Sequence, residues 1–190
     1  MRYRLVATLA CLVAAACSKP IGWITIDPAT LSPAQQAQLA RADQARNELA
    51  TALLTELQAA IAKDGAAAAI DVCRLRAPAI ARDIAARTGV QLGRTSVKLR
   101  NPDNVTPAWA TAHVVGTGTE AATFVVEDGR LGSLAPIRLM PLCVQCHGQR
   151  DDLATDVRAA LDRHYPADQA TGFAPGDLRG WFWVEVPAGS

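Results

Sequence analysis

The chain has 190 residues, of which 50% are hydrophobic and 19% charged, a balance that can bury a core and excludes a disordered chain. The formal net charge is +1, so the composition lacks the basic excess of a nucleic-acid-binding protein. Aromatic residues make up 5% and residues 66–69 are all alanine, which favours a largely helical protein over a β-sandwich.

The first residues have the pattern of an export signal. Arg2 and Arg4 precede an apolar run from Leu5 to Ala16 that is too short to cross a bilayer and ends in small residues. We therefore expect residues 1–16 to be a signal peptide. The segment before Cys17 is similar to a bacterial lipoprotein box, which predicts lipidation of Cys17 and a periplasmic, membrane-anchored protein. The small residues fit ordinary signal cleavage and a free periplasmic form as well.

Helical signals follow a tether that we place at residues 17–31, with a short extended piece at 23–26. Ser32 fits the N-cap position before Pro33, and leucines at helical spacing lead to Ile61, which predicts one helix of about 30 residues ending at Gly65. A second helix is expected over 66–76, interrupted by Pro78. It resumes to Thr88 and ends at Gly89, a typical left-handed cap.

From Val90 onward the pattern changes to strands. The turn sequence at residues 127–130 predicts a hairpin between two of them. Shorter helices are expected near 107–112 and over 151–164. The expected strands are 90–99, 123–126, 134–140 and 181–186. The predicted fold class is α+β, with the helices first and a small antiparallel sheet after them, in a single domain over 32–190.

The motif Cys143-Val144-Gln145-Cys146-His147 has the form C-x-x-C-H, which is typical of c-type haem attachment. Two thiols one helical turn apart can bond the two vinyl groups along one edge of the porphyrin, and the adjacent histidine is then held beneath the iron. The export signal would deliver the chain to the compartment where haem is attached. We therefore expect one covalent haem c, bound through Cys143 and Cys146, with His147 as the proximal iron ligand.

Three other interpretations of the motif explain less. A structural zinc site could combine both cysteines with Cys73 and a histidine, but it gives no reason for a histidine directly after Cys146. A thioredoxin-like redox pair needs a βαβ context and a helix that begins at the first cysteine. A disulfide between residues three apart is strained. Haem accounts for all three motif residues at once.

The second axial ligand is less determined by the residues. Met140 is too close to the motif in sequence to reach the opposite haem face easily, while His113 and His164 stand at ordinary structural positions. Cys73 lies on the apolar face of a predicted helix. It is either a thiolate ligand of the iron or a buried free cysteine, and both interpretations stay open at this point.

Several sequence blocks occur in an order that is similar to one family. They are Ile70-Asp71-Val72-Cys73, the block from Gly93 to Asn104 (GRTSVKLRNPDN), Pro107 with Trp109, the C-x-x-C-H motif, Tyr165 to Ala170 (YPADQA) and Gly176 to Gly180 (GDLRG). Together they resemble the single-haem c-type domains with a PAS-like fold, which occur alone or fused ahead of sensor kinases. The resemblance covers nearly all of the predicted mature chain and implies His147 and Cys73 as axial ligands. Ala110 departs from it, since an acidic residue usually follows the tryptophan.

Two functions follow from this interpretation. The first is one-electron transfer to a redox partner protein. The second is redox or gas sensing, in which Cys73 leaves the iron and a separate partner receives the signal; reduction should weaken thiolate binding. Two protein ligands would close the iron, so we expect no enzymatic activity. Arg94, Lys98 and Arg100, on alternate strand positions, would either pair with haem propionates or form a solvated basic face.

Overall fold

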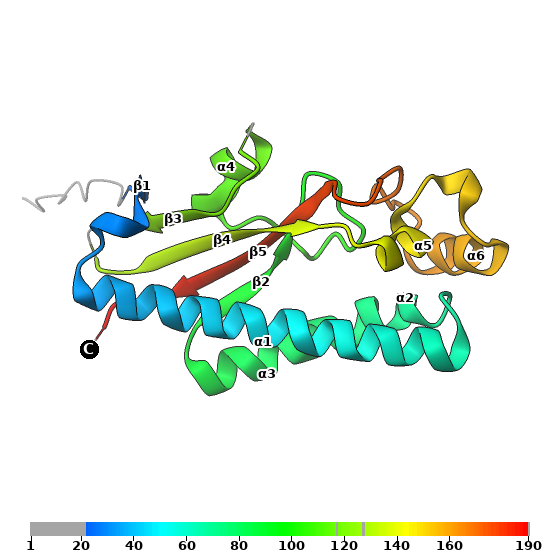
Figure 1. Cartoon of the computed structure of the whole chain (residues 1–190), viewed down its shortest axis with the longest axis horizontal. Coiled ribbons are helices and arrows are strands. Elements are labelled where there is room, and N and C mark those ends of the chain that lie inside the picture. Colours follow the sequence, from blue (N-terminus) through cyan, green and yellow to red (C-terminus); the bar gives the residue numbers. More distant parts are fainter. Residues whose placement is uncertain (1–21, 117, 127, 190) are drawn as a thin grey trace, which may run out of the picture.

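The computed structural model describes residues 22–116, 118–126 and 128–189. The predicted signal peptide, Cys17 and the first residues of the predicted tether lie outside the described residues. A five-stranded sheet, two long helices on one of its faces and a group of short helices at one end make up the fold (Figure 1). This arrangement confirms the predicted α+β class with a long N-terminal helix.

The long helix α1 spans Pro33–Asp64 and has the predicted boundaries. The Ser32 side chain accepts a hydrogen bond from the backbone N–H of Gln35, whose side chain in turn accepts one from the backbone N–H of Ser32. This capping box satisfies donors that the first helical turn leaves free. Gly65 ends the helix with φ at 82°, a conformation that costs glycine little. Among the described residues, no helix is long and apolar enough to cross a membrane.

The next helical region differs from the prediction. It comprises α2 (Ala69–Asp71), a π-helical turn (Val72–Arg76) and α3 (Ala77–Thr88), which ends at a left-handed Gly89. The helix is not broken at Pro78. The backbone stays helical through Arg76 and Ala77, so Pro78 lies inside a continuous helical segment and removes one of its N–H donors. The irregularity is the π-helical turn that precedes it.

All strand pairs in the sheet are antiparallel, in the order β1-β3-β4-β5-β2. The predicted hairpin is β3 with β4. In chain order the strands are β1 Ile24–Ile26, β2 Gln91–Thr95, β3 Ala122–Val125, β4 Leu131–Arg138 and β5 Leu178–Val186. The extended piece expected before the first helix is thus the edge strand β1.

Strand β2 is shorter than the predicted 90–99. It ends at Thr95 because the Ser96 hydroxyl donates to the Arg179 carbonyl and accepts from the backbone N–H of Lys98, which turns the chain. Lys98 and Arg100 are therefore not on the strand face that carries Arg94, contrary to the sequence expectation. The helix expected over 151–164 is α6 (Thr155–His164), preceded by a 3-10 turn at Arg150–Asp152.

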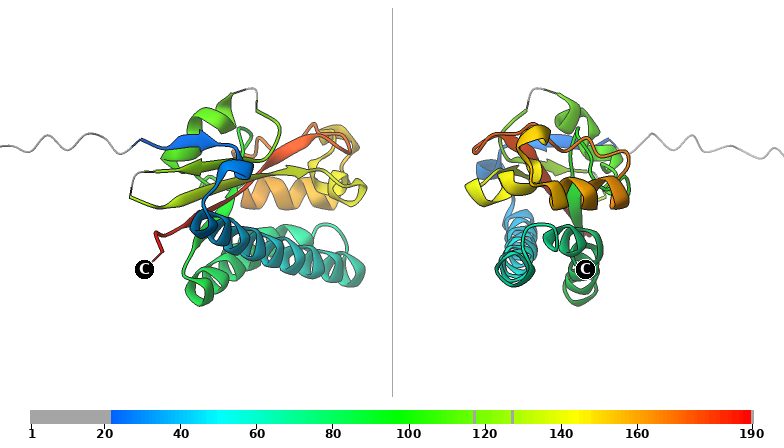
Figure 2. Two further views of the ribbon diagram at one scale, coloured as in Figure 1. Left: turned by 60° about the vertical axis from the view of Figure 1, so that its left-hand side comes forward. Right: turned by 90° about the vertical axis from the view of Figure 1, so that its right-hand side faces the viewer.

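The core lies between the sheet and the helices α1 and α3, which cover the same sheet face (Figure 2). Ala42, Ala45 and Leu49 of α1 pack there against Ile84 of α3 and Val184 of β5. The other face carries an aromatic cluster and the short helix α4 (Thr111–Val115). At one end of the molecule, beyond the sheet, the C-terminal part of α1 packs against α2, and α5 (Val144–His147) and α6 lie at the same end (Figure 1).

Candidate functional site

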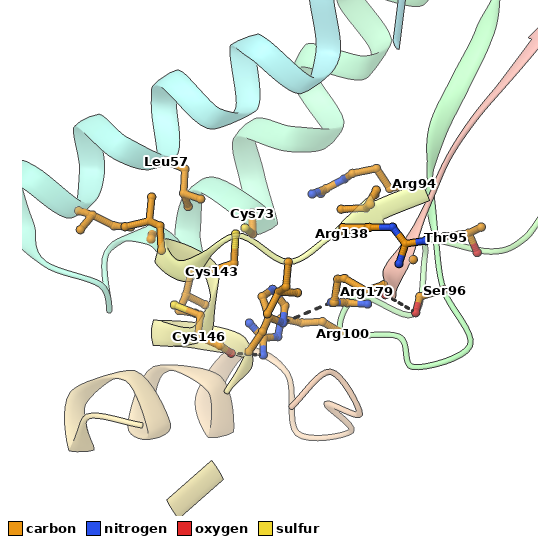
Figure 3. A pocket seen from close by; sticks show the side chains of 18 residues that line it. Leu57, Cys73, Arg94, Thr95, Ser96, Arg100, Arg138, Cys143, Cys146 and Arg179 are labelled. Carbon is orange, nitrogen blue, oxygen red and sulfur yellow. Dashed lines mark hydrogen bonds between the residues drawn. The ribbon is translucent and has the colours of Figure 1, made fainter. Parts of the chain in front are cut away.

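The C-x-x-C-H motif follows directly after strand β4. A 3-10 turn (Pro141–Cys143) carries the first cysteine, and the single turn of α5 carries Cys146 and His147. All three motif residues line a cavity of about 170 Å³ that opens to solvent (Figure 3).

Cys73 lines the same cavity from the π-helical turn, although it is distant from the motif in sequence. Leu57 and Ile61 of α1 add apolar surface beside it. The cysteines at 73, 143 and 146 are all free thiols. In the described part of the chain, no three Cys, His, Asp or Glu side chains gather as a metal site requires, so the arrangement does not favour the zinc interpretation.

The other candidate ligands lie elsewhere. The His113 ring packs edge-on against Trp181, at 4.9 Å between ring centroids, on the aromatic face of the sheet. The His164 ring lies 4.0 Å from an Asp71 carboxylate oxygen at the end of α6. Met140 is 43% exposed. These three residues do not line the cavity.

A backbone contact orients the His147 imidazole. Its Nδ1 lies 2.7 Å from the carbonyl oxygen of Ala170. Because a carbonyl oxygen only accepts, Nδ1 must carry the proton, and Nε2 keeps its lone pair. The Nε of Arg179 lies 3.3 Å from the same Nδ1. Because a protonated Nδ1 has no free lone pair, it cannot accept a hydrogen bond from Arg179. Nδ1 bound to a carbonyl is the arrangement that fixes a metal-ligating histidine.

The electrostatic surroundings keep this imidazole neutral. Burial, followed by the positive charges of Arg100 and Arg179, holds the pKa of His147 well below its usual range. Burial also raises the pKa of the Cys146 thiol to about 11, although the positive charge of Arg100 acts in the opposite direction and lowers it. At neutral pH the cavity therefore presents an uncharged imidazole and an uncharged thiol.

Arg100 joins the motif to the segment that orients His147. Its Nη2 donates to the carbonyl oxygens of Cys146, at 2.6 Å, and Ala170, at 3.1 Å, and its Nε and Nη2 donate to both carboxylate oxygens of Asp168. Asp168 also accepts from the backbone N–H of Ala170. Both side chains of the ion pair are buried, with 6% and 3% exposed. Arg100 thus has a positioning role and not the propionate-pairing role considered from sequence.

Sequence reasoning did not assign roles to Asp168, Ala170 and Arg179, although all three lie in blocks that carried the family resemblance. No sequence signal showed that Asp168 is buried, and only that burial, seen in the structure, shows that its carboxylate requires a cation or several N–H donors. Lys98, in contrast, lies over the Phe173 ring, with Nζ 5.1 Å from its centroid, and does not line the cavity.

Comparison with known proteins identifies the family of this chain. A family model described as Tll0287-like matches residues 32–187. The chain belongs to the Tll0287-like family. Every residue of the cavity of this Tll0287-like chain falls within the matched range, from Leu57 to Gly180.

A solved structure supports the fold of the Tll0287-like chain. It is the crystal structure of the cyanobacterial haem protein Tll0287, with a TM-score of 0.57 and 21% sequence identity, over 83% of this chain and 97% of that one. No curated protein matches the chain.

Proposed function

We propose that this chain binds one haem covalently through Cys143 and Cys146, with His147 and Cys73 as the two axial ligands. The observation that carries the proposal is that the whole C-x-x-C-H motif and the distant Cys73 line one cavity. The family membership and the solved relative, which is named as a haem protein, support it. The predicted signal at residues 1–16 and the predicted lipid site at Cys17 extend the proposal to a periplasmic, membrane-anchored protein.

The residues of the cavity fit this group. Two free thiols lie one helical turn apart on the cavity wall, and the lone pair of His147 Nε2 is available. Leu57, Ile61 and Ile70 provide apolar walls. Haem would supply a one-electron iron couple at this position. The chain would hold it by two thioether bonds, orient one ligand through Ala170, and limit the access of water through the apolar walls.

We propose electron transfer to a partner protein as the function, without catalysis. Two ligands from the protein would leave the iron no open position for a substrate. Sensing is the second candidate, and one observation favours it. Cys73 stands on a π-helical turn and lines a second, neighbouring groove together with Leu54 and Phe182. Such turns are frequent at functional sites, and the groove provides space on the side of Cys73.

The first experiment is the electron paramagnetic resonance spectrum, with optical spectra, of the ferric protein made in a host that attaches haem c. We expect a low-spin signal of thiolate plus imidazole, and haem that stays with the chain after denaturation. A protein without haem would contradict the whole proposal. A high-spin or bis-histidine signal would remove Cys73 from the iron and leave covalent attachment intact.

Carbon monoxide distinguishes the two candidate functions. An electron-transfer protein that retains both ligands in the ferrous state should show no change in its optical spectrum when the gas is added. A rapid shift to a carbon monoxide spectrum, with loss of the thiolate signature, would favour the sensor.

A further inference from the structure

The cavity has two chemically different ends. Cys143 and Cys146 lie at one end, and the side chains of Arg138 and Arg179 lie toward the other (Figure 3). Arg94 also lines the cavity, and it shares a neighbouring groove with Cys73. Among the described residues that line it, there is no aspartate or glutamate. An occupant that fits must therefore be apolar over most of its surface and negatively charged at one edge.

The arginines differ in how their charge is balanced. Arg100 is paired with the buried Asp168, and Arg138, at the exposed rim, is paired with Glu120 at 3.1 Å. For Arg94 and Arg179, no carboxylate of a described residue lies within ion-pair distance. Two positive charges thus face the cavity without a counter-charge from the described chain.

Arg179 is fixed in this position. Its Nη1 donates to the Lys98 carbonyl at 3.0 Å, and its own carbonyl accepts from the Ser96 hydroxyl at 2.7 Å. Its guanidinium lies over the Phe173 ring, 5.5 Å from the centroid. An anion beside this half-buried guanidinium would balance its charge.

Arg94 comes from the strand next to this segment. It is half-buried on β2, one residue before Thr95, where β2 pairs with β5. The short separation between these strands is fixed at Gly180, where an added Cβ would lie 2.3 Å from the Thr95 carbonyl oxygen. Arg94 and Arg179 are therefore carried by two paired strands, and both line the cavity.

We infer that Arg94 and Arg179 bind the carboxylate groups of the tetrapyrrole, while the cysteines at the opposite end bind its vinyl edge. The inference rests on the proposed function, because it assigns the charged edge of the same occupant. A guanidinium matches a carboxylate with two parallel hydrogen bonds. The two ends together would set one orientation of the haem in the cavity before the thioether bonds form.

The test uses a probe that cannot form thioether bonds. Ferric mesoporphyrin IX carries ethyl groups in place of vinyl groups, so its affinity for the full haem-free chain reports non-covalent binding. Its dimethyl ester lacks the negative charges. We expect the diacid to bind at least about tenfold more tightly than the diester, since charge-assisted hydrogen bonds to buried groups have effects of this size. Arg94→Gln and Arg179→Gln should each reduce that ratio several-fold.

Arg82→Gln is the matched control, because Arg82 is an exposed arginine of α3 that does not line this cavity. It removes the same charge and should leave the ratio unchanged. Equal affinities of diacid and diester for the wild-type chain would overturn the inference and leave haem binding standing. Binding of neither porphyrin would instead contradict the proposed function.

A free small anion is the other source of the same chemistry. Succinate, added to the haem-free chain, should compete with the mesoporphyrin diacid if both occupy the arginine pair. The contrary result is that succinate stabilises the haem-free chain in a way that depends on Arg94 and yet leaves mesoporphyrin binding unchanged. That result would assign Arg94 and Arg179 to a free dicarboxylate and overturn the inference.

Discussion

At the scale of single residues, the site depends on protonation states that the sequence motif does not specify. The C-x-x-C-H spacing predicts which side chains face a haem, but not that Ala170 fixes the His147 tautomer. Arg100 donates to the same Ala170 carbonyl. This shared acceptor limits how much negative charge the carbonyl can place on the imidazole, so Arg100 moderates the donor strength of His147.

Cys73→Ala tests the second ligand. The variant should keep its covalent haem, because the thioether bonds involve Cys143 and Cys146 only. Its ferric iron should change from low to high spin and its reduction potential should rise, since an anionic donor that favours ferric iron has gone. Spin state and potential are measured by paramagnetic resonance and redox titration. Met140→Leu removes a nearby exposed sulfur and is the control. A ferric spectrum like that of wild type would mean that Cys73 does not bind the iron.

The pKa of Cys146, raised to about 11, predicts slow alkylation in the folded, haem-free chain. At pH 8 only about 0.1% of such a thiol is thiolate, compared with about a quarter of an unperturbed cysteine. Alkylation by iodoacetamide, followed by mass spectrometry, should be at least about tenfold slower at Cys146 in the folded chain than in urea. The rate should continue to rise with pH toward 11. A folded-state plateau near pH 8.5 would contradict the shift.

At the scale of elements, local signals predicted the boundaries that depend on neighbouring residues. Ser32, Pro33 and Gly65 predicted the bounds of α1 by their capping preferences, and the turn sequence at 127–130 predicted the hairpin of β3 with β4. The end of β2 was not predictable in this way, because it depends on the bond from Ser96 to the distant Arg179 carbonyl. The π-helical turn that carries Cys73 ends shortly before Pro78, which predicts an irregularity in the helix but not its form. Helical periodicity placed Cys73 on an apolar face but could not show which cavity that face meets.

The segment that holds the motif depends on the ion pair between Arg100 and Asp168. Arg100→Gln leaves a buried carboxylate without its cation and should lower the free energy of unfolding of the haem-free chain by about 3–5 kcal/mol, measured by urea unfolding. The exposed pair of Arg150 with Asp162 provides the control, and Arg150→Gln should cost less than about 1 kcal/mol. Equal losses in the two variants would mean that the buried pair does not hold the segment.

At the scale of the whole molecule, α1 packs against the sheet core near its N-terminal end and lines the cavity near its C-terminal end. Its buried residues, Gln38, Ala42, Ala45 and Leu49, all lie at or before position 49 and pack into the fold. Leu57 and Ile61, in the second half, are half-buried and line the cavity. One continuous helix therefore connects the sheet core with the site. The packing of the second half depends on the site more than on the core.

Haem attachment should therefore protect the two halves of α1 differently. Amides that open locally exchange quickly, whereas amides in the packed core are protected before any ligand binds. When exchange is followed over seconds to minutes, the backbone amides of residues 53–64 should exchange more slowly after haem attachment. The amides of residues 69–76, around Cys73, should also slow. Residues 38–49 of the same helix provide an internal control and should change little. Equal protection along the whole of α1, or a change confined to residues 38–49, would contradict a site that is completed by the second half of this helix.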